Sequence, residues 1–383
     1  MKLLRRLQPA ALLLAALAAT ACEPRNSARG GAAAADTAAW TLSAEPVAQA
    51  GEMGRTALYR VYSGYLAPDG GFVVGNSGTG QVLFFAADGR LARATGRRGA
   101  GPGEFQSVSW VHRLPGDSTL VFDMRGSRFS VLDGAGRYAR SFSARIPGRS
   151  LRPLAVYPDG TLLMAEEGRF DPRRAAGLLR DSMALFRMDR QGGIVDTLAT
   201  LPGSEWVNYG DGSSYRTTQL TFGRTGHVAL TGDRLVYGSS EAPELTVRPP
   251  GAAPETRLRL PVAPRRLESA ELDAHLDEMV QGLRGAQRDA TLRTLREIRL
   301  PTDAPLFTEL RGDRAQHLWV QLAAPHGARS ARWVVFAPDG RAAGSVLLPA
   351  GARLLDVEGD RVLLKLADAD DEETVAIYRV NKP

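Results

Sequence analysis

The chain has 383 residues, of which 44% are hydrophobic, and a formal net charge of +6. Lys2, Arg5 and Arg6 supply three of its positive charges, and the other basic residues are almost all arginines scattered among acids. No basic helix or aromatic-basic module occurs, which excludes the usual nucleic-acid-binding patterns. The length suits one large domain built from repeats.

The N-terminus has the pattern of a signal peptide. Positive residues precede an apolar run at residues 10–18, which is too short to span a bilayer. Small residues then lead to Cys22, the only cysteine of the chain. The sequence ATAC at residues 19–22 resembles the bacterial lipobox, which implies that residues 1–21 are a lipoprotein signal peptide and that Cys22 is lipidated. The alternative is an ordinary secretory signal in which Cys22 has no special role.

The residues after the cysteine predict an anchored envelope protein. Residues 22–39 are rich in Ala, Gly and Ser, as in a flexible tether. Glu23 follows the cysteine, and by resemblance to Gram-negative lipoproteins this residue favours the outer membrane. We therefore expect a monomeric protein of the bacterial envelope that is attached to the membrane through the lipid on Cys22.

One stretch, residues 96–143, contains a complete repeat module. A Gly-rich crossing precedes four short apolar runs, and turns rich in Gly, Asp and Pro separate them. The runs are Trp110–Leu114, Thr119–Phe122, Arg128–Leu132 and Tyr138–Phe142. Four short antiparallel strands are typical of one propeller blade.

The same order of runs recurs along the chain. The related modules span residues 58–95, 151–200, 219–261, 306–349 and 353–380. With residues 96–143 they predict an all-β, six-bladed β-propeller over residues 40–383. The last module lacks an outermost strand, and residues 40–49 (WTLSAEPVAQ) are predicted to supply it and close the ring.

The sequence GRRGAGPGEFQSVSWV at residues 96–111, with the later LVFD and FSVLDGAGRYARSF, resembles NHL-type six-bladed β-propellers. It is especially similar to the bacterial envelope lipoproteins that have this fold. The resemblance implies a fold and a compartment. It implies no activity, because such folds host unrelated functions.

Two stretches interrupt the propeller pattern. Residues 264–300, between the fourth and fifth modules, have apolar residues at helical spacing, with Gly285 between two expected helices. This insertion is expected either to plug or cap one face of the ring, or to be a partner-docking element or lid. Residues 202–219 are polar with Trp206, Tyr209 and Tyr215 interleaved, which predicts sugar or peptide contact; the alternative is that these rings pack on the adjacent blade.

Common catalytic motifs are absent from the sequence. There is no G-x-S-x-G elbow, no two histidines have H-x-H or H-x-x-x-H spacing, and the Gly-rich crossing leads into a strand rather than a helix. His227 and His317 occupy like positions in their modules and are expected to be surface or structural residues. These features favour a protein without catalytic activity, and we expect no cofactor.

Polar residues that follow the second run of several modules support an alternative. If they line the ring axis, Asn76, Asp123, Glu166 and Gln321 offer oxygen ligands for Ca²⁺. The alternative function is then a metal-dependent hydrolase or lactonase with Asn76, Asp123 and Glu166 as metal ligands. The competing interpretation is that Asp123 only accepts hydrogen bonds from backbone amides beside its turn.

The favoured hypothesis is a lipid-anchored envelope propeller that binds a protein or glycan partner. Its candidate binding residues are Trp206, Tyr209, Tyr215, Asp123 and Gln321.

Overall fold

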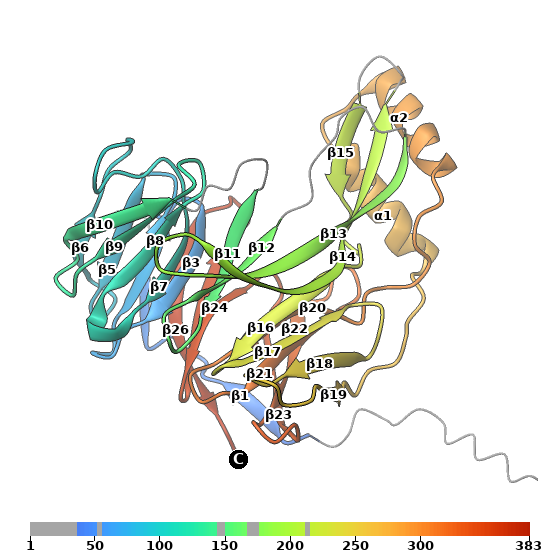
Figure 1. Ribbon diagram of the computed structural model, residues 1–383. Coiled ribbons are helices and arrows are strands. Elements are labelled where there is room, and N and C mark those ends of the chain that lie inside the picture. The colour runs from blue at the N-terminus through green and yellow to red at the C-terminus, as the bar shows by residue number, and fades with distance from the viewer. Residues whose placement is uncertain (1–36, 52–55, 144–149, 167–175, 211–214) are drawn as a thin grey trace, which may run out of the picture. The chain divides into compact units, whose positions relative to one another are not determined.

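The computed structural model describes residues 37–51, 56–143, 150–166, 176–210 and 215–383 (Figure 1). These residues form an all-β fold of the propeller type, in which short antiparallel strands follow one another through tight turns. No helix within these ranges is long and apolar enough to cross a membrane. The predicted signal peptide and Cys22 lie outside the described residues, as does most of the tether.

Two four-stranded sheets begin the fold, and each contains consecutive strands only. The first consists of β3 (Val61–Leu66), β4 (Phe72–Asn76), β5 (Gln81–Phe85) and β6 (Leu91–Thr95). The second consists of β7 (Val108–Arg113), β8 (Thr119–Asp123), β9 (Arg128–Leu132) and β10 (Tyr138–Ser143), with a 3-10 turn at Pro115–Asp117. The four strands predicted for residues 96–143 are therefore present, with ends shifted by two residues or fewer.

The next two sheets have the same consecutive order. The third has five strands, β11 (Leu151–Val156), β12 (Leu162–Glu166), β13 (Gly177–Met188), β14 (Ile194–Gly210) and β15 (Tyr215–Gln219). The fourth has four strands, β16 (Gly226–Thr231), β17 (Arg234–Ser239), β18 (Glu244–Arg248) and β19 (Thr256–Arg259). Two helices, α1 (Ser269–Met279) and α2 (Gly285–Glu297), follow β19 and precede the last sheet.

The last sheet joins the two ends of the described chain. It contains β20 (Phe307–Gly312), β21 (Leu318–Leu322), β22 (Ser330–Phe336), β23 (Ala342–Pro349), β24 (Arg353–Glu358), β25 (Arg361–Ala367) and β26 (Glu373–Asn381), with the N-terminal strands β1 (Ala39–Leu42) and β2 (Ala48–Ala50). Strand β1 pairs parallel to β23 and antiparallel to β26, and β2 pairs antiparallel to β26. Residues 40–49 thus pair with the last strand as predicted, and the second pairing with β23 was not predicted.

Close backbone packing fixes this N-terminal segment. Gly89, in the turn between β5 and β6, has φ +80, and a Cβ there would lie 2.2 Å from the carbonyl oxygen of Gln49. Only glycine combines this backbone conformation with so close an approach. The first sheet therefore contacts the segment that precedes it in the chain.

Apolar clusters fill the spaces between successive sheets. The first and last sheets share one cluster around Phe72, Phe85 and Ile377. The second and third sheets share another around Phe122, Phe129, Leu162, Met164 and Phe186. Three further clusters join the other neighbouring sheets, those of Val82, Phe105 and Leu132, of Leu163, Leu185 and Leu235, and of Val236, Phe307 and Phe336. The cluster of Trp319, Trp333 and Val362 packs the two halves of the last sheet against each other. Each buried large side chain contributes roughly 1.5–3 kcal/mol to stability, so packing between sheets is the main stabilising interaction.

Strands β13 and β14 extend beyond the rest of their sheet and carry a further element. We call β15, α1, α2 and the paired strand ends at residues 177–180 and 205–210 the side module (Figure 1). It has an apolar cluster of its own, in which Val207, Tyr209 and Leu220 pack against Leu276 and Leu295 of the helices. Residues 202–219 were predicted to contact a sugar or peptide, with packing on the adjacent blade as the alternative, and their described part belongs to strands β14 and β15.

Candidate functional site: a central cavity

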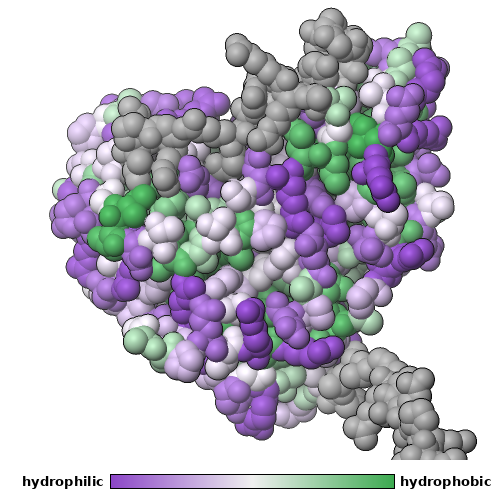
Figure 2. Space-filling model, turned by 45° about the vertical axis from the view of Figure 1, so that its right-hand side comes forward, coloured by the Kyte–Doolittle hydropathy of each residue, from purple (hydrophilic) through white to green (hydrophobic). Residues whose placement is uncertain are grey.

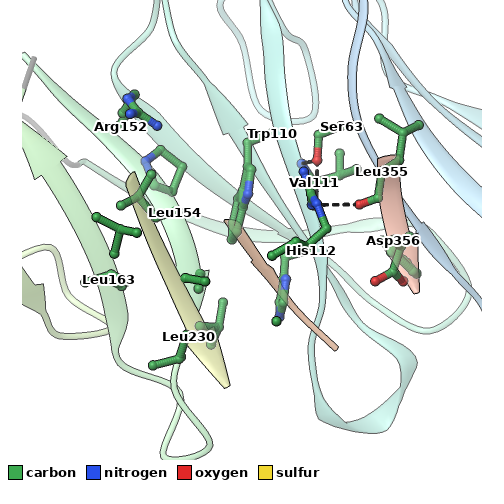
Figure 3. A pocket seen from close by; sticks show the side chains of 18 of the residues that line it. Ser63, Trp110, Val111, His112, Arg152, Leu154, Leu163, Leu230, Leu355 and Asp356 are labelled. Atoms are coloured by element: carbon green, nitrogen blue, oxygen red, sulfur yellow. Dashed lines mark hydrogen bonds between the residues drawn. The ribbon is translucent and has the colours of Figure 1, made fainter. Parts of the chain in front are cut away.

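The first strands of successive sheets surround a cavity of about 740 Å³ (Figure 3). Most of the lining comes from β3, β7, β11, β16, β20 and β24, and β12 and β13 contribute Leu163 and Met183. This volume lies within the usual range of roughly 300–1,000 Å³ for small-molecule sites. Figure 2 shows that hydrophobic residues form separate groups among hydrophilic ones on the face it presents.

Hydrogen bonds between the first strands hold the cavity wall together. The Ser63 hydroxyl donates to the Val111 carbonyl at 3.1 Å, and the Val111 amide donates to the Ser63 hydroxyl oxygen at 3.1 Å. The Leu66 amide donates to a carboxylate oxygen of Asp356 at 2.8 Å. Strand β3 is therefore fixed to β7 on one side and to β24 on the other, so the cavity is a preformed space rather than a gap between mobile strands.

One side of the cavity is apolar. Leu154 of β11, Leu163 of β12 and Leu230 of β16 gather on this side (Figure 3). Trp110 of β7 stacks on His112, with ring centroids 5.2 Å apart and planes 4° apart. An apolar wall with an aromatic ring offers favourable burial to a ligand body.

Arginines give another part of the cavity a positive charge. Arg311 of β20 donates to Glu309 at 2.7 Å and to the Leu355 carbonyl at 2.9 Å. Arg353 begins β24, and its side chain makes no hydrogen bond or ion pair within the described ranges of the chain. Arg353 is exposed to the cavity, yet protein surrounds it closely enough that desolvation lowers its pKa; Glu309 opposes this lowering, while the charges of Arg311 and Arg152 add to it.

Two histidines lie in the cavity and are neutral at pH 7. Burial lowers the pKa of His112 to about 4, and the nearby charge of Arg314 lowers it further. Burial likewise lowers the pKa of His227 to about 4, with Arg152 adding to the effect. His227, which was expected to be a surface or structural residue, lines the cavity, and its ring centroid is 5.1 Å from that of Phe307. Neutral imidazoles can donate or accept a hydrogen bond without adding charge.

Asn76 and Asp123 lie outside the residues that line this cavity. The Asn76 side chain accepts from the Tyr59 amide at 2.8 Å and donates to the Ala57 carbonyl at 3.1 Å. Asp123 is 1% exposed, and its carboxylate accepts from three backbone amides, those of Gln106, Ser107 and Gly126. These side chains fix the chain that enters a first strand, as the competing interpretation of Asp123 predicted.

Glu166 and Gln321 end or nearly end the second strands of their sheets. Glu166 pairs through its backbone with Leu151, and Gln321 with Glu309 and Trp333. Neither lines the central cavity. No group of three or more His, Cys, Asp or Glu side chains within the described residues is arranged to hold a metal ion.

The three predicted aromatic residues have different surroundings in the side module. Trp206 is 37% exposed, whereas Tyr209 is 5% exposed and packs in the cluster that includes the helices. Tyr215 begins β15, where its backbone pairs with Gly210, and its side chain lies outside the described part of the structure. Of the described rings, Trp206 is the one that solvent reaches.

The comparisons with known proteins agree with the fold. No protein-family model matches the chain, and no curated protein matches it. The fold is similar to that of a member of the DUF4221 family from Bacteroides vulgatus (TM-score 0.51, 13% identity, covering 89% of this chain and 98% of that one). Lower TM-scores relate it to virginiamycin B lyase from Staphylococcus aureus (0.43, 9% identity, 84% and 95% covered) and to regucalcin, a calcium-binding protein from Agrobacterium tumefaciens (0.40, 12% identity, 90% and 97% covered). With 13% identity, the first likeness shows the fold alone.

Sequence reasoning missed the residues of the cavity. Trp110 and His112 lie on β7, whereas Arg152, Glu309 and Arg353 lie on three other strands, and the five residues have no shared motif. One signal was present: the first strands carry polar and charged residues, whereas the second strands are almost entirely apolar. In a propeller the first strands lie next to the axis, so this difference could have indicated a polar cavity.

Proposed function

We propose that this protein is a six-bladed, NHL-type envelope propeller that binds a partner and has no catalytic role. In this proposal β20–β23 form one blade and β24–β26 with β2 form another, and β1 joins the two. The pairing of β1 with both β23 and β26 supports this count. Joining the N-terminal strands to the C-terminal blade removes exposed strand edges.

The proposed location is the outer membrane of a bacterial envelope. Residues 1–21 act as the signal peptide, the lipid on Cys22 anchors a monomer, and residues 22–39 are the tether. This part of the proposal is based on the sequence at residues 19–23. Several acyl chains on one cysteine would anchor the protein durably, because each buried methylene contributes roughly 0.8 kcal/mol.

The partner, a protein or a glycan, is proposed to dock on the side module. The observation that carries this proposal is that the side module has a core of its own while Trp206 remains 37% exposed on it. Helices α1 and α2 pack against β14, and the described residues that line the central cavity include none from either helix. Docking is therefore favoured over a plug or a lid.

Site-specific photo-crosslinking in cells tests the proposal. A photoreactive amino acid replaces Trp206 in the full chain, and a matched control replaces Leu347, which is 59% exposed on β23. We expect a discrete adduct at 206 and none at 347, and protease digestion distinguishes a protein partner from a glycan. Equal labelling at both positions, or none at 206, would overturn docking on the side module.

The anchor is tested in the same cells. We expect the Cys22→Ser variant to move from the outer-membrane fraction to the soluble envelope fraction while the protein stays folded. If this variant remains in the membrane fraction, the lipid anchor is refuted. The alternative, a Ca²⁺-dependent hydrolase or lactonase with Asn76, Asp123 and Glu166 as ligands, stays a prediction, which metal analysis of the purified protein would test.

A further inference from the structure

We propose that the central cavity binds a small organic anion, whose carboxylate or phosphate group contacts Arg353 and whose apolar part packs against Leu154 and Leu230. This site is separate from the side module. It therefore goes beyond the proposed partner and does not depend on it.

Positive charge is in excess near Arg353. Arg152, Arg311 and Arg353 lie close enough that the first two lower the pKa of the third, and the carboxylate of Glu309 acts in the opposite direction, with a smaller effect from Tyr62. Glu309 already accepts two hydrogen bonds from the guanidinium of Arg311. Arg353 is thus left without a counter-ion among the described residues.

The side chain of Arg353 has the geometry to bind an oxyanion. A guanidinium presents five N–H donors in a planar fork that matches a carboxylate or a phosphate. None of these donors on Arg353 is used in the part of the chain that the structure describes, although the side chain faces a partly desolvated cavity. An entering oxyanion would relieve the mutual repulsion of the arginines and occupy these donors.

The same cavity has an apolar side. Leu154, Leu163 and Leu230 lie together there, and Trp110 stands beside them (Figure 3). Leu154 and Leu230 are half-buried, so an inorganic ion would leave their exposed surface in contact with water, whereas burying an apolar group against it gains roughly 25 cal/mol per Å². The cavity therefore fits an anion that carries an apolar body.

The two histidines of the cavity can bind polar groups of the ligand. Because His112 and His227 are neutral at pH 7, they add hydrogen-bonding capacity without adding charge. The cavity is therefore selective for one anionic group held by arginine, with additional polar groups on the ligand placed near the imidazoles.

Isothermal titration calorimetry on residues 23–383, which include every described strand and helix, tests the proposal. The ligands are 3-phenylpropanoate and 3-phenylpropyl phosphate. The uncharged analogue is 3-phenylpropanol, and acetate and inorganic phosphate are the anions that lack a large apolar group. We expect one or both aromatic anions to bind at one site per chain, and the alcohol and the small anions to bind at least tenfold more weakly. The two aromatic anions distinguish a carboxylate from a phosphate ligand.

Variants identify the site. Arg353→Gln should weaken binding tenfold or more, because a hydrogen-bonded ion pair is lost, and Arg353→Lys should lose less. Arg341→Gln, at an exposed arginine in the turn between β22 and β23, is the matched control and should bind as the wild type does. Thermal melts confirm that each variant is folded. Absence of binding by both aromatic anions, equal affinity for the alcohol, or unchanged affinity in Arg353→Gln would each overturn the proposal.

Discussion

The Asp123 carboxylate gives the sharpest test of how the propeller is held together. Its oxygens accept backbone amides at 2.9 Å from Gln106, 3.0 Å from Ser107 and 3.3 Å from Gly126. In Asp123→Asn one oxygen becomes an NH₂ group that faces donors and cannot accept from them. Each hydrogen bond to a charged group is worth about 1.5–3 kcal/mol. Since water reaches part of this crossing, we expect the free energy of unfolding to fall by about 2–3 kcal/mol.

Urea unfolding followed by fluorescence measures this change. The matched control is Asp88→Asn, because Asp88 makes a similar turn hydrogen bond to the Arg90 amide but is exposed. We expect it to cost less than about 1 kcal/mol. Excess Ca²⁺ or chelator should leave the wild-type midpoint unchanged. If Ca²⁺ stabilised the wild type and Asp123→Asn abolished that effect, Asp123 would be a metal ligand and this reasoning would be refuted.

Two further predictions concern acid and ring closure. The pKa of His112 is about 4 in the fold against an ordinary 6.5. Between these pH values the unfolded chain binds more protons than the folded one. The free energy of unfolding should therefore fall as the pH drops from about 6.5 towards 4, by up to about 1.4 kcal/mol per pH unit. Urea midpoints of the wild type and His112→Gln check this, and equal pH slopes would contradict it. Trp40 of β1 is 8% exposed and lies edge-on to Trp319, with the ring centroids 6.1 Å apart. Trp40→Ala should therefore lower the free energy of unfolding in urea by about 3–5 kcal/mol. A loss no larger than that of Leu347→Ala, at an exposed position, would show that β1 does not help to close the fold.

The strands of residues 96–143 were predictable because their turns are local. Gly, Asp and Pro at fixed positions define hairpins without help from distant residues. The role of Asp123 as an acceptor for backbone amides was also foreseen, since a buried acid beside a turn has amide donors nearby. In both cases the physical cause lies within a few tens of residues.

Residues 202–219 could not be assigned in this way. Their many polar residues favour a loop, but Val207 and Tyr209 alternate with more polar neighbours and meet helices that follow some 60 residues later. That tertiary contact stabilises a strand against its local preference. The cavity was missed for a related reason, because Trp110, His112 and Arg353 come together only when the sheets curl around a common axis.

Polar side chains that have hydrogen-bond partners within the described fold differ from Arg353, which has none there. Three side chains each accept a hydrogen bond from a backbone amide just before β3, β7 or β16. Asn76 accepts from the Tyr59 amide, Asp123 from that of Gln106 and Glu205 from that of Arg224. Glu373 does the same for the Val61 amide at 2.7 Å. These side chains are explained by the fold alone. Arg353 is different, because it is a cation in a partly desolvated cavity without a counter-ion among the described residues. Solvent reaches this side chain, so it stays charged without a ligand, but the described fold uses none of its donors, whereas an anionic ligand would use them.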